Sequence, residues 1–353
     1  MTINAKTLFD PSLEKDNCGF GLIAQRNGKR SRKLVKKSIL GLTSMTHRGA
    51  IGADGKTGDG CGLLFDLNHS FFKLKVGGEL DVELPDFFAV AQLFHKNDID
   101  FYYSSIRKFL NSQDLDIAVT RSVPVNNEVL GKIARQNLPN ISQVFITSKN
   151  TNLNKERFEA CLLQARKFIE EKFDNDEEFY VCSMSTQTIV YKGLMLPSAI
   201  DEFYLDLKDK KFEAKICLFH QRFSTNTLPR WHLAQPFRLL AHNGEINAIR
   251  GNRNWAKARK SKFSTALIPE ITTFKNLVNE KGSDSSALDN MIEILVKGGI
   301  NTFRALRMVL PPAWQNIHMM DPEIKSFHEY NSMHMEAWDG PAGIVMSDGR
   351  WAI

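Results

Sequence analysis

The sequence predicts a globular fold that contains both helices and strands. Of its 353 residues, 42% are hydrophobic and 24% are charged, which is ordinary for a soluble protein with a large core. Through the middle of the chain, apolar runs of strand length alternate with longer stretches in which apolar residues recur at helical spacing. No stretch approaches the roughly 18 uninterrupted apolar residues of a membrane helix. We therefore expect one large domain or two smaller ones, and no membrane span.

The N-terminal elements are a strand and a helix. Residues 18–25 (CGFGLIAQ) are short, apolar and interrupted by glycine, which is typical of a buried strand with a close backbone neighbour. Ser31 can cap a following helix in which Val35, Ile39 and Leu42 share one face. The basic run at its start, residues 30–37, is typical of a solvated helix face, and a nucleic-acid patch is the alternative.

Residues 47–62 (HRGAIGADGKTGDGCG) are too rich in glycine for a regular element. The segment has too few residues between Gly52 and Gly55 for a phosphate-binding Gly-x4-Gly-Lys-Ser/Thr loop. We expect a long loop near a functional site.

The middle of the chain is predicted to be scaffold. Strands are expected at residues 87–94, 117–123, 143–147 and 179–184, and amphipathic helices at residues 99–110 and 155–173. Cys161 falls on the apolar stripe of the second helix and is expected in the core. No polar cluster in this region predicts chemistry.

The character of the sequence changes after residue 215. A strand at residues 216–219 leads into a polar turn, and a second strand at residues 237–241 ends at the tetrapeptide HNGE. A helix is expected from about Asn247, and a polar loop at residues 282–290 precedes a helix at residues 291–296. The last residues form two strand-like runs around an Asp-Gly turn, a hairpin signal. Because native chains seldom end on an apolar strand, we expect this domain to continue beyond residue 353.

Cysteine usage and the first residues indicate the compartment. The five cysteines are scattered and lack the spacing of a metal site, so reduced thiols in the cytoplasm are expected: Cys18, Cys61, Cys161, Cys182 and Cys217. Residues 1–16 lack the basic start and apolar run of a secretory signal. We interpret the segment before Cys18 as a short propeptide.

The junction Asn17-Cys18-Gly19 is the most informative feature. If residues 1–17 are removed, Cys18 carries a nucleophilic thiol and a proton-accepting α-amine on one residue. A free α-amine has a pKa of ~7.7–8.0, so near neutral pH it can accept the thiol proton. A buried structural cysteine is the alternative.

Four further residues have the chemistry that thiolate cleavage of a carboxamide requires. Asn243 and Gly244 can offer a side-chain amide and a backbone N–H to one oxyanion, although Asn-Gly is also typical of a hairpin turn. Arg222 and Asp284 can bind the α-carboxylate and the α-ammonium of an amino acid, although each alone is more often a surface charge.

These motifs occur together in one known family. The segments DNCGFGLIA, THRGA with DGKTGDG, HQRFSTNT with LAQPFR and LAHNGEIN, GSDSSALDN, and WDGPAGIVMSDGR resemble, in order, the glutaminase domain of the large subunit of glutamate synthase. That domain belongs to the N-terminal-nucleophile (class II) glutamine amidotransferases. The resemblance runs from Cys18 to Ile353. One departure is CGFGL where the family usually has CGVGF, which exchanges apolar bulk beside the nucleophile.

The resemblance implies a fold and a set of roles. The fold is an α+β, four-layer αββα sandwich of two antiparallel sheets, made of residues 18–353 after removal of the propeptide 1–17. Cys18 corresponds to the nucleophile, and Asn243 and Gly244 to the oxyanion hole. The substrate-binding positions are the carboxylate clamp, the ammonium anchor and a further pocket arginine: Arg222, Asp284 and Arg48.

The resemblance also implies a reaction. Glutamine is hydrolysed through a Cys18 thioester, and the ammonia passes to a synthase part that converts 2-oxoglutarate to glutamate. That part uses FMN and a [3Fe-4S] cluster, with NADPH and FAD or ferredoxin as electron source. A small NADPH-oxidising subunit is an expected partner. Nucleic acid and membranes are not expected partners. Clustered cysteines and a strand-linked Gly-x-Gly-x-x-Gly are missing here, so no cofactor or metal site is expected in these 353 residues.

Three other functions are also compatible with the sequence. A related acylase of the N-terminal-nucleophile class would not need the paired Arg222 and Asp284. A nucleic-acid-binding module would use the basic run at residues 30–37, Arg30 to Lys37. A non-catalytic assembly domain would not depend on Cys18. The sequence assigns no role to the histidines of the quoted motifs: His47, His220 and His242.

Overall fold

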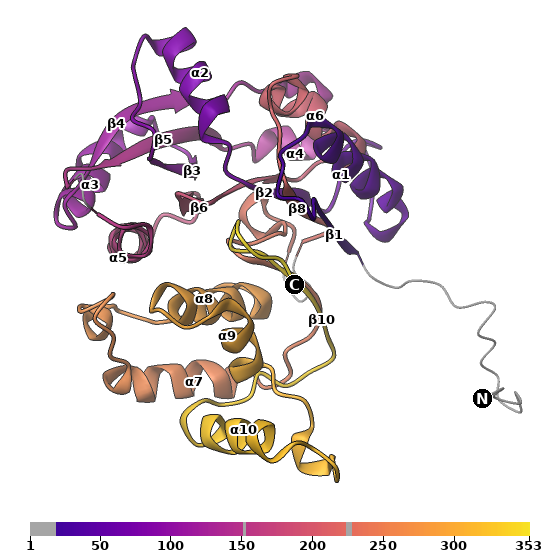
Figure 1. The fold of residues 1–353 in the computed structure, drawn as a ribbon. Helices are drawn as coiled ribbons and strands as arrows, with labels where there is room; N and C mark the ends of the chain where they lie inside the picture. Colours follow the sequence, from indigo (N-terminus) through magenta and orange to yellow (C-terminus); the bar gives the residue numbers. More distant parts are fainter. Residues whose placement is uncertain (1–18, 151–152, 224–227) are drawn as a thin grey trace, which may run out of the picture.

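The computed structural model describes residues 19–150, 153–223 and 228–353, and among these residues the strands form three antiparallel sheets (Figure 1). The first sheet has the order β1 (Phe20–Ala24), β8 (Ile216–Gln221), β2 (Cys61–Asp66), β7 (Thr188–Gly193). The second has the order β4 (Leu115–Ser122), β5 (Asn140–Ser148), β3 (Ala89–His95), β6 (Tyr180–Ser185). The third is the pair β10 (Ala342–Met346) and β9 (Leu240–Gly244).

The helices described in these ranges complete the layers. They are α1 (Arg32–Ser44), α2 (His69–Leu80), α3 (Ile99–Asn111), α4 (Lys132–Gln136), α5 (Lys155–Lys172), α6 (Ile200–Phe203), α7 (Ile249–Arg259), α8 (Asp284–Lys297), α9 (Thr302–Val309) and α10 (Pro322–His334). No helix in the described part of the chain has both the length and the apolar character needed to cross a bilayer.

Four layers stack in the order helix, sheet, sheet, helix. Alternate side chains of each strand pack against the layers on its two faces. One face of the first sheet, including Leu63 of β2, packs with Val35 of α1. The opposite face packs on the β9–β10 pair through residues such as Ala241. Leu240, which precedes Ala241 in β9, lies on the other face of the pair and packs with Leu288 and other residues of α8. Because neighbouring residues of a strand point to opposite faces, the β9–β10 pair is buried on both sides. The predicted α+β sandwich of antiparallel sheets between helices is confirmed.

The second four-stranded sheet lies beside this stack and is joined to it by the short connection from β6 to β7. Helix α2 covers one face, where the rings of Phe72 and Phe145 lie 5.9 Å apart. Helices α3 and α5 cover the other face, and Cys161 is buried there as predicted. All four strands predicted in the middle of the chain are found in this sheet, and both predicted helices are found within two residues of their expected bounds.

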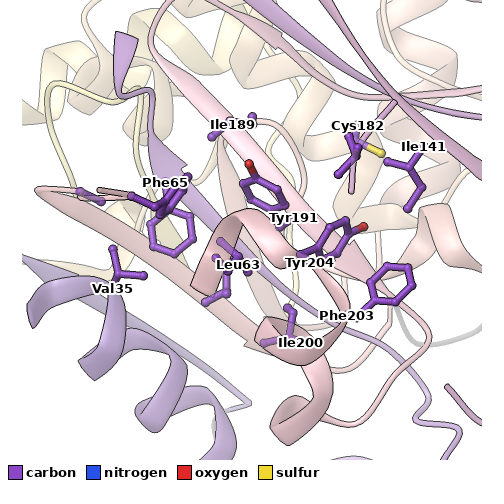
Figure 2. Close-up of a cluster of buried hydrophobic side chains, with 14 of the residues drawn as sticks. Val35, Leu63, Phe65, Ile141, Cys182, Ile189, Tyr191, Ile200, Phe203 and Tyr204 are labelled. Atoms are coloured by element: carbon purple, nitrogen blue, oxygen red, sulfur yellow. The ribbon is translucent and has the colours of Figure 1, made fainter. Parts of the chain in front are cut away.

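The largest core cluster spans α1, both four-stranded sheets and α6. Figure 2 shows Leu63 and Phe65 of β2 with Tyr191 of β7, close to Val35 and Tyr204. Burying each such apolar side chain contributes about 1.5–3 kcal/mol of transfer free energy. The one polar atom that Tyr204 brings into this core is satisfied, since its Oη donates to the Lys192 carbonyl at 2.7 Å.

Two predicted boundaries near the C-terminal half are wrong. The polar loop expected at residues 282–290 is the first half of α8, because Ser283 caps the helix by accepting the Ser286 N–H at 3.1 Å. The strand expected at residues 237–241 is found instead at Leu240–Gly244, as β9. The displacement arises because the buried Asp289 carboxylate accepts the N–H groups of Arg238, Leu239 and Leu240 and holds a turn there.

The predicted C-terminal hairpin is present in shortened form. Met346 and Ile353 exchange two backbone hydrogen bonds of 2.9 Å, and Ser347 bridges to Ala352. The turn needs Gly349, whose φ of 84° lies in the left-handed region. The main partner of β10 is β9, which contributes Asn243 and Gly244.

Candidate active site

Strands β1, β8 and β9 meet at a small cavity of about 60 Å³. It is lined by residues from six separate segments: Gly19, Arg48, His220, Gln221, Arg222, Phe223, Gln235, His242, Asn243, Gly244 and Ser285. Four of the six predicted site residues therefore lie around one cavity, namely Arg48, Arg222, Asn243 and Gly244.

Gly19 lies where β1 begins. Its carbonyl accepts the Gln221 N–H at 2.6 Å, and Phe20 pairs with His220 across the two strands. A Cβ on Gly19 would lie 3.0 Å from the Gln221 carbonyl oxygen, so a larger residue is crowded there. The predicted nucleophile, Cys18, lies outside the described residues.

Arg222 follows β8 directly and has an unusual backbone. Its φ of 137° is a region that L-residues rarely adopt, and such strain persists where surrounding contacts enforce it. Its Nε donates to Asp59 Oδ2 at 2.8 Å, while its side chain stays 45% exposed. Burial raises the pKa of Asp59, an effect that the hydrogen bond and charge of Arg222 oppose. Asp59 belongs to the glycine-rich loop of residues 47–62. This loop therefore lies beside the cavity, which agrees with the prediction of a loop near a functional site.

Asn243 and Gly244 end β9 rather than forming a tight turn. Asn243 pairs with Gly343 and Gly244 with Ala342 on β10. Gly244 has φ of 143°, and a Cβ there would lie 1.8 Å from the Pro341 carbonyl oxygen. Only glycine fits this position, so the backbone can bring its N–H close to a ligand.

Two buried histidines face the cavity in their neutral form. Burial lowers the pKa of His220 to about 4, although its Nδ1 lies 3.2 Å from the Arg222 carbonyl oxygen. Burial also lowers the pKa of His242, an effect that the charge of Asp284 opposes, and its Nδ1 lies 2.7 Å from Ser285 Oγ.

The cavity wall holds polar atoms that the described residues do not satisfy. His220 Nε2, His242 Nε2 and both side-chain polar atoms of Gln221 are buried and make no hydrogen bond within the described part of the chain. Buried polar groups normally find a partner in protein, water or ligand. The cavity is therefore suited to a small polar ligand rather than to an apolar one.

Asp284 does not line the cavity but lies directly behind it. It is the first residue of α8, where its Oδ2 accepts the Ile246 N–H at 2.9 Å and its Oδ1 accepts the Ser285 N–H at 2.7 Å. The neighbouring Ser285 lines the cavity in its place. A carboxylate in the first turn of a helix is a common cap position, and this alone does not make it a ligand.

Several contributors to the site were not predicted. Gln221, Gln235 and Ser285 line the cavity, and Asp59 holds Arg222 from behind. Gln235 and Ser285 lie inside quoted motifs, and Asp59 is a carboxylate within a glycine-rich loop, so the signals were available. None of them indicates by itself which residue reaches the cavity.

Outside this site, the described cysteines are buried core residues. Burial raises the pKa of the four described cysteine thiols, which is typical of unreactive core residues: Cys61, Cys161, Cys182 and Cys217. No group of three His, Cys, Asp or Glu suited to a metal ion was found among the described residues. In the basic run, Arg30 binds Asp66, and Arg32 binds the Phe212 carbonyl.

Comparisons with known proteins identify the family of this chain. The sequence pattern of the family described as "Glutamine amidotransferases class-II" matches residues 18–353, and the chain belongs to this family. Among its relatives, "Glutamate synthase [NADPH] large chain" of Bacillus subtilis is 38% identical over 352 residues, 98% of this chain and 23% of the relative. "Glutamate synthase [NADH]" of Saccharomyces cerevisiae is 36% identical over 359 residues, 98% of this chain and 17% of the relative. "Ferredoxin-dependent glutamate synthase 1, chloroplastic/mitochondrial" of Arabidopsis thaliana is 37% identical over 351 residues, 96% of this chain and 21% of the relative. The chain thus spans about a fifth of the length of these relatives.

Proposed function

We propose that this chain hydrolyses L-glutamine to glutamate and ammonia. The observation that carries the proposal is the convergence of Gly19, Arg222, Asn243 and Gly244 on one small polar cavity. Family membership over residues 18–353 supports the same reaction and agrees with a domain that starts at residue 18. Residues 1–17 are then the propeptide, and their removal gives Cys18 its free amine.

The chemistry follows from these positions. Gly19, which follows Cys18 directly in the sequence, lines the cavity, and this supports Cys18 as the nucleophile. The terminal amine accepts the thiol proton, and the thiolate attacks the γ-carboxamide carbon. Asn243 and Gly244 donate to the oxyanion, and removing one such donor typically costs about 2.7–4 kcal/mol of transition-state stabilisation. The amine's proton then leaves with ammonia, and water hydrolyses the thioester to glutamate.

The substrate's α-amino acid end needs charged partners. Arg222 is the proposed carboxylate clamp, with Arg48 beside it, because both line the cavity. Asp284 is the proposed ammonium anchor, acting from the base of α8 beside Ser285. The hydrogen bond between Ser285 Oγ and Asp284 Oδ1, at 3.3 Å, connects this carboxylate to the cavity wall.

The wider role is also a proposal. The relatives' names describe glutamate synthases that depend on NADH, NADPH or ferredoxin. We infer that this domain supplies ammonia to a synthase part bearing FMN and a [3Fe-4S] cluster. NADPH with FAD, through a small subunit, or ferredoxin would supply the electrons. We propose a cytoplasmic setting for this domain.

The decisive experiment concerns Cys18. Cys18→Ala is expected to abolish ammonia release from L-glutamine while leaving the circular dichroism spectrum unchanged. Mass spectrometry of the purified protein should show a species that begins at Cys18. Persistent glutaminase activity in the variant would refute the assignment. Turnover of N-acyl substrates in preference to glutamine would favour an acylase instead.

A further inference from the structure

Strand β9 has one edge that faces away from β10. The third sheet has two described strands, so no strand pairs with this edge at His242. The side chain of Gln235 occupies the place of a neighbouring strand. Its Oε1 accepts the His242 N–H at 2.8 Å, and its Nε2 donates to the His242 carbonyl at 2.9 Å. One amide side chain thus makes both hydrogen bonds that a paired strand would make.

Strand geometry connects this contact to the proposed oxyanion hole. Along a strand, the backbone N–H groups of successive residues point to opposite edges. The Glu245 N–H donates to the Pro341 carbonyl at 3.1 Å, on the β10 side, whereas the His242 N–H points to Gln235. Gly244, two residues after His242, directs its N–H to the same edge as His242. Gln235 holds this same edge. Gln235 and Gly244 both line the cavity.

Gln235 is itself fixed in place. It is 2% exposed, and its backbone N–H donates to the Arg222 carbonyl at 3.3 Å. A Cβ on Gly62 of β2 would lie 2.6 Å from the Gln235 carbonyl oxygen, so the first sheet packs closely against it. Gln235 therefore connects the residue proposed to bind the substrate carboxylate with the strand that presents the oxyanion donors.

We propose that Gln235 is a positioning residue for glutamine hydrolysis, which aligns the oxyanion donors of β9 by holding its unpaired edge. This inference rests on the proposed function. Donors of this kind act mainly in the transition state, and an error of about 1 Å in their position can cost 100-fold in rate. Loss of the Gln235 amide should therefore lower kcat more than it raises KM.

The test uses Gln235→Met, which keeps the side-chain length and removes both hydrogen bonds. We expect kcat for ammonia release to fall 10- to 100-fold, while KM for L-glutamine and the inhibition constant of L-glutamate stay within about threefold. Gln164→Met is the matched control. Gln164 is also buried, and its side-chain Nε2 donates to the Ala160 carbonyl at 3.4 Å, within its own helix.

Gln235→Glu keeps the proposal testable if the methionine variant does not fold. A protonated carboxyl can donate to the His242 carbonyl and accept from its N–H, whereas an ionised carboxylate can only accept. The kcat of this variant relative to wild type is therefore expected to fall as the pH rises.

The outcomes separate the two proposals. If wild type and Gln164→Met release no ammonia, the proposed function fails. If both are active and Gln235→Met keeps kcat within threefold, the inference about Gln235 is overturned. It is equally overturned if KM and the glutamate inhibition constant rise by the same factor as kcat falls, or if the kcat ratio of Gln235→Glu does not change with pH.

Discussion

Single residues in the site combine backbone strain with side-chain pairing. Arg222 has a positive φ of 137°, and Gly244, on the next strand of the cavity wall, has φ of 143°. Arg222 is held there by Asp59, and Gly244 by the close approach of Pro341. The conformation of Arg222 costs about 1–3 kcal/mol and persists where the surrounding structure enforces it, whereas glycine adopts a positive φ without such a cost. Both residues occupy positions that the proposed mechanism needs fixed.

The pH dependence of stability should report the burial of His220. Burial lowers the pKa of His220 to about 4 in the folded state, against about 6.5 in an unfolded chain. Above pH 6.5 the group is neutral in both states. As the pH falls from 6.5 to 4 the unfolded chain binds a proton first, so the free energy of unfolding decreases, by on the order of 3 kcal/mol for this residue.

Denaturant unfolding of wild type and His220→Gln between pH 7 and pH 4 measures this effect. The variant is expected to lose less stability over that range than wild type does. His334→Gln, at the exposed end of α10, is the matched control and should follow the wild-type curve. Identical pH dependence in wild type and His220→Gln would show that His220 does not cause the acid loss.

At the scale of elements, the start of α8 explains both a wrong prediction and a feature of the site. Ser and Asp residues in GSDSSALDN favour loops by propensity, which led to the expectation of a loop. The same residue types are the preferred caps of a helix, and Ser283 and Asp284 take those positions. The apolar spacing of Ala287, Leu288 and Met291 was the signal for a helix.

Removing this cap should affect stability and substrate binding together. Ser283→Ala is expected to lower the free energy of unfolding by about 1 kcal/mol, because the Ser286 N–H loses its acceptor. It should also raise KM for L-glutamine, since Asp284 and Ser285 follow directly. Asn154→Ala removes the cap of α5, away from the cavity, and should destabilise the protein without changing KM. Equal KM values in the two variants would contradict the placement of α8 at the substrate site.

At the scale of the whole molecule, the sequence predicts the class of fold and the chemistry. It predicts less well which distant segments meet at the cavity. Regular apolar spacing locates the strands and helices of the second sheet, because their packing follows the periodic pattern. The cavity is different, since it joins segments as distant as Gly19 and Ser285. Gln235 and Asp59 act through contacts between such segments, and no local pattern specifies which distant backbone group a side chain will meet.

Buried ion pairs join α5, which covers the second sheet, to α8 of the four-layer stack. Arg166 of α5 binds Glu293 of α8, and Lys297 of α8 binds Glu159 of α5. Glu159 is 2% exposed, and its carboxylate also accepts hydrogen bonds from Ser185 and Thr186. Burial would raise the pKa of Glu159, but the charge of Lys297 and these hydrogen bonds hold it below its usual value.

Breaking one of these pairs should therefore be costly, and removing both of its charges should not. Lys297→Met leaves a buried carboxylate without its cation, which typically costs about 3–5 kcal/mol. The double variant Lys297→Met with Glu159→Gln should recover much of that loss, because the neutral amide can still bond Ser185 and Thr186. Urea unfolding of the single and double variants measures both values. A double variant no more stable than Lys297→Met would show that the loss does not come from leaving the Glu159 charge unpaired.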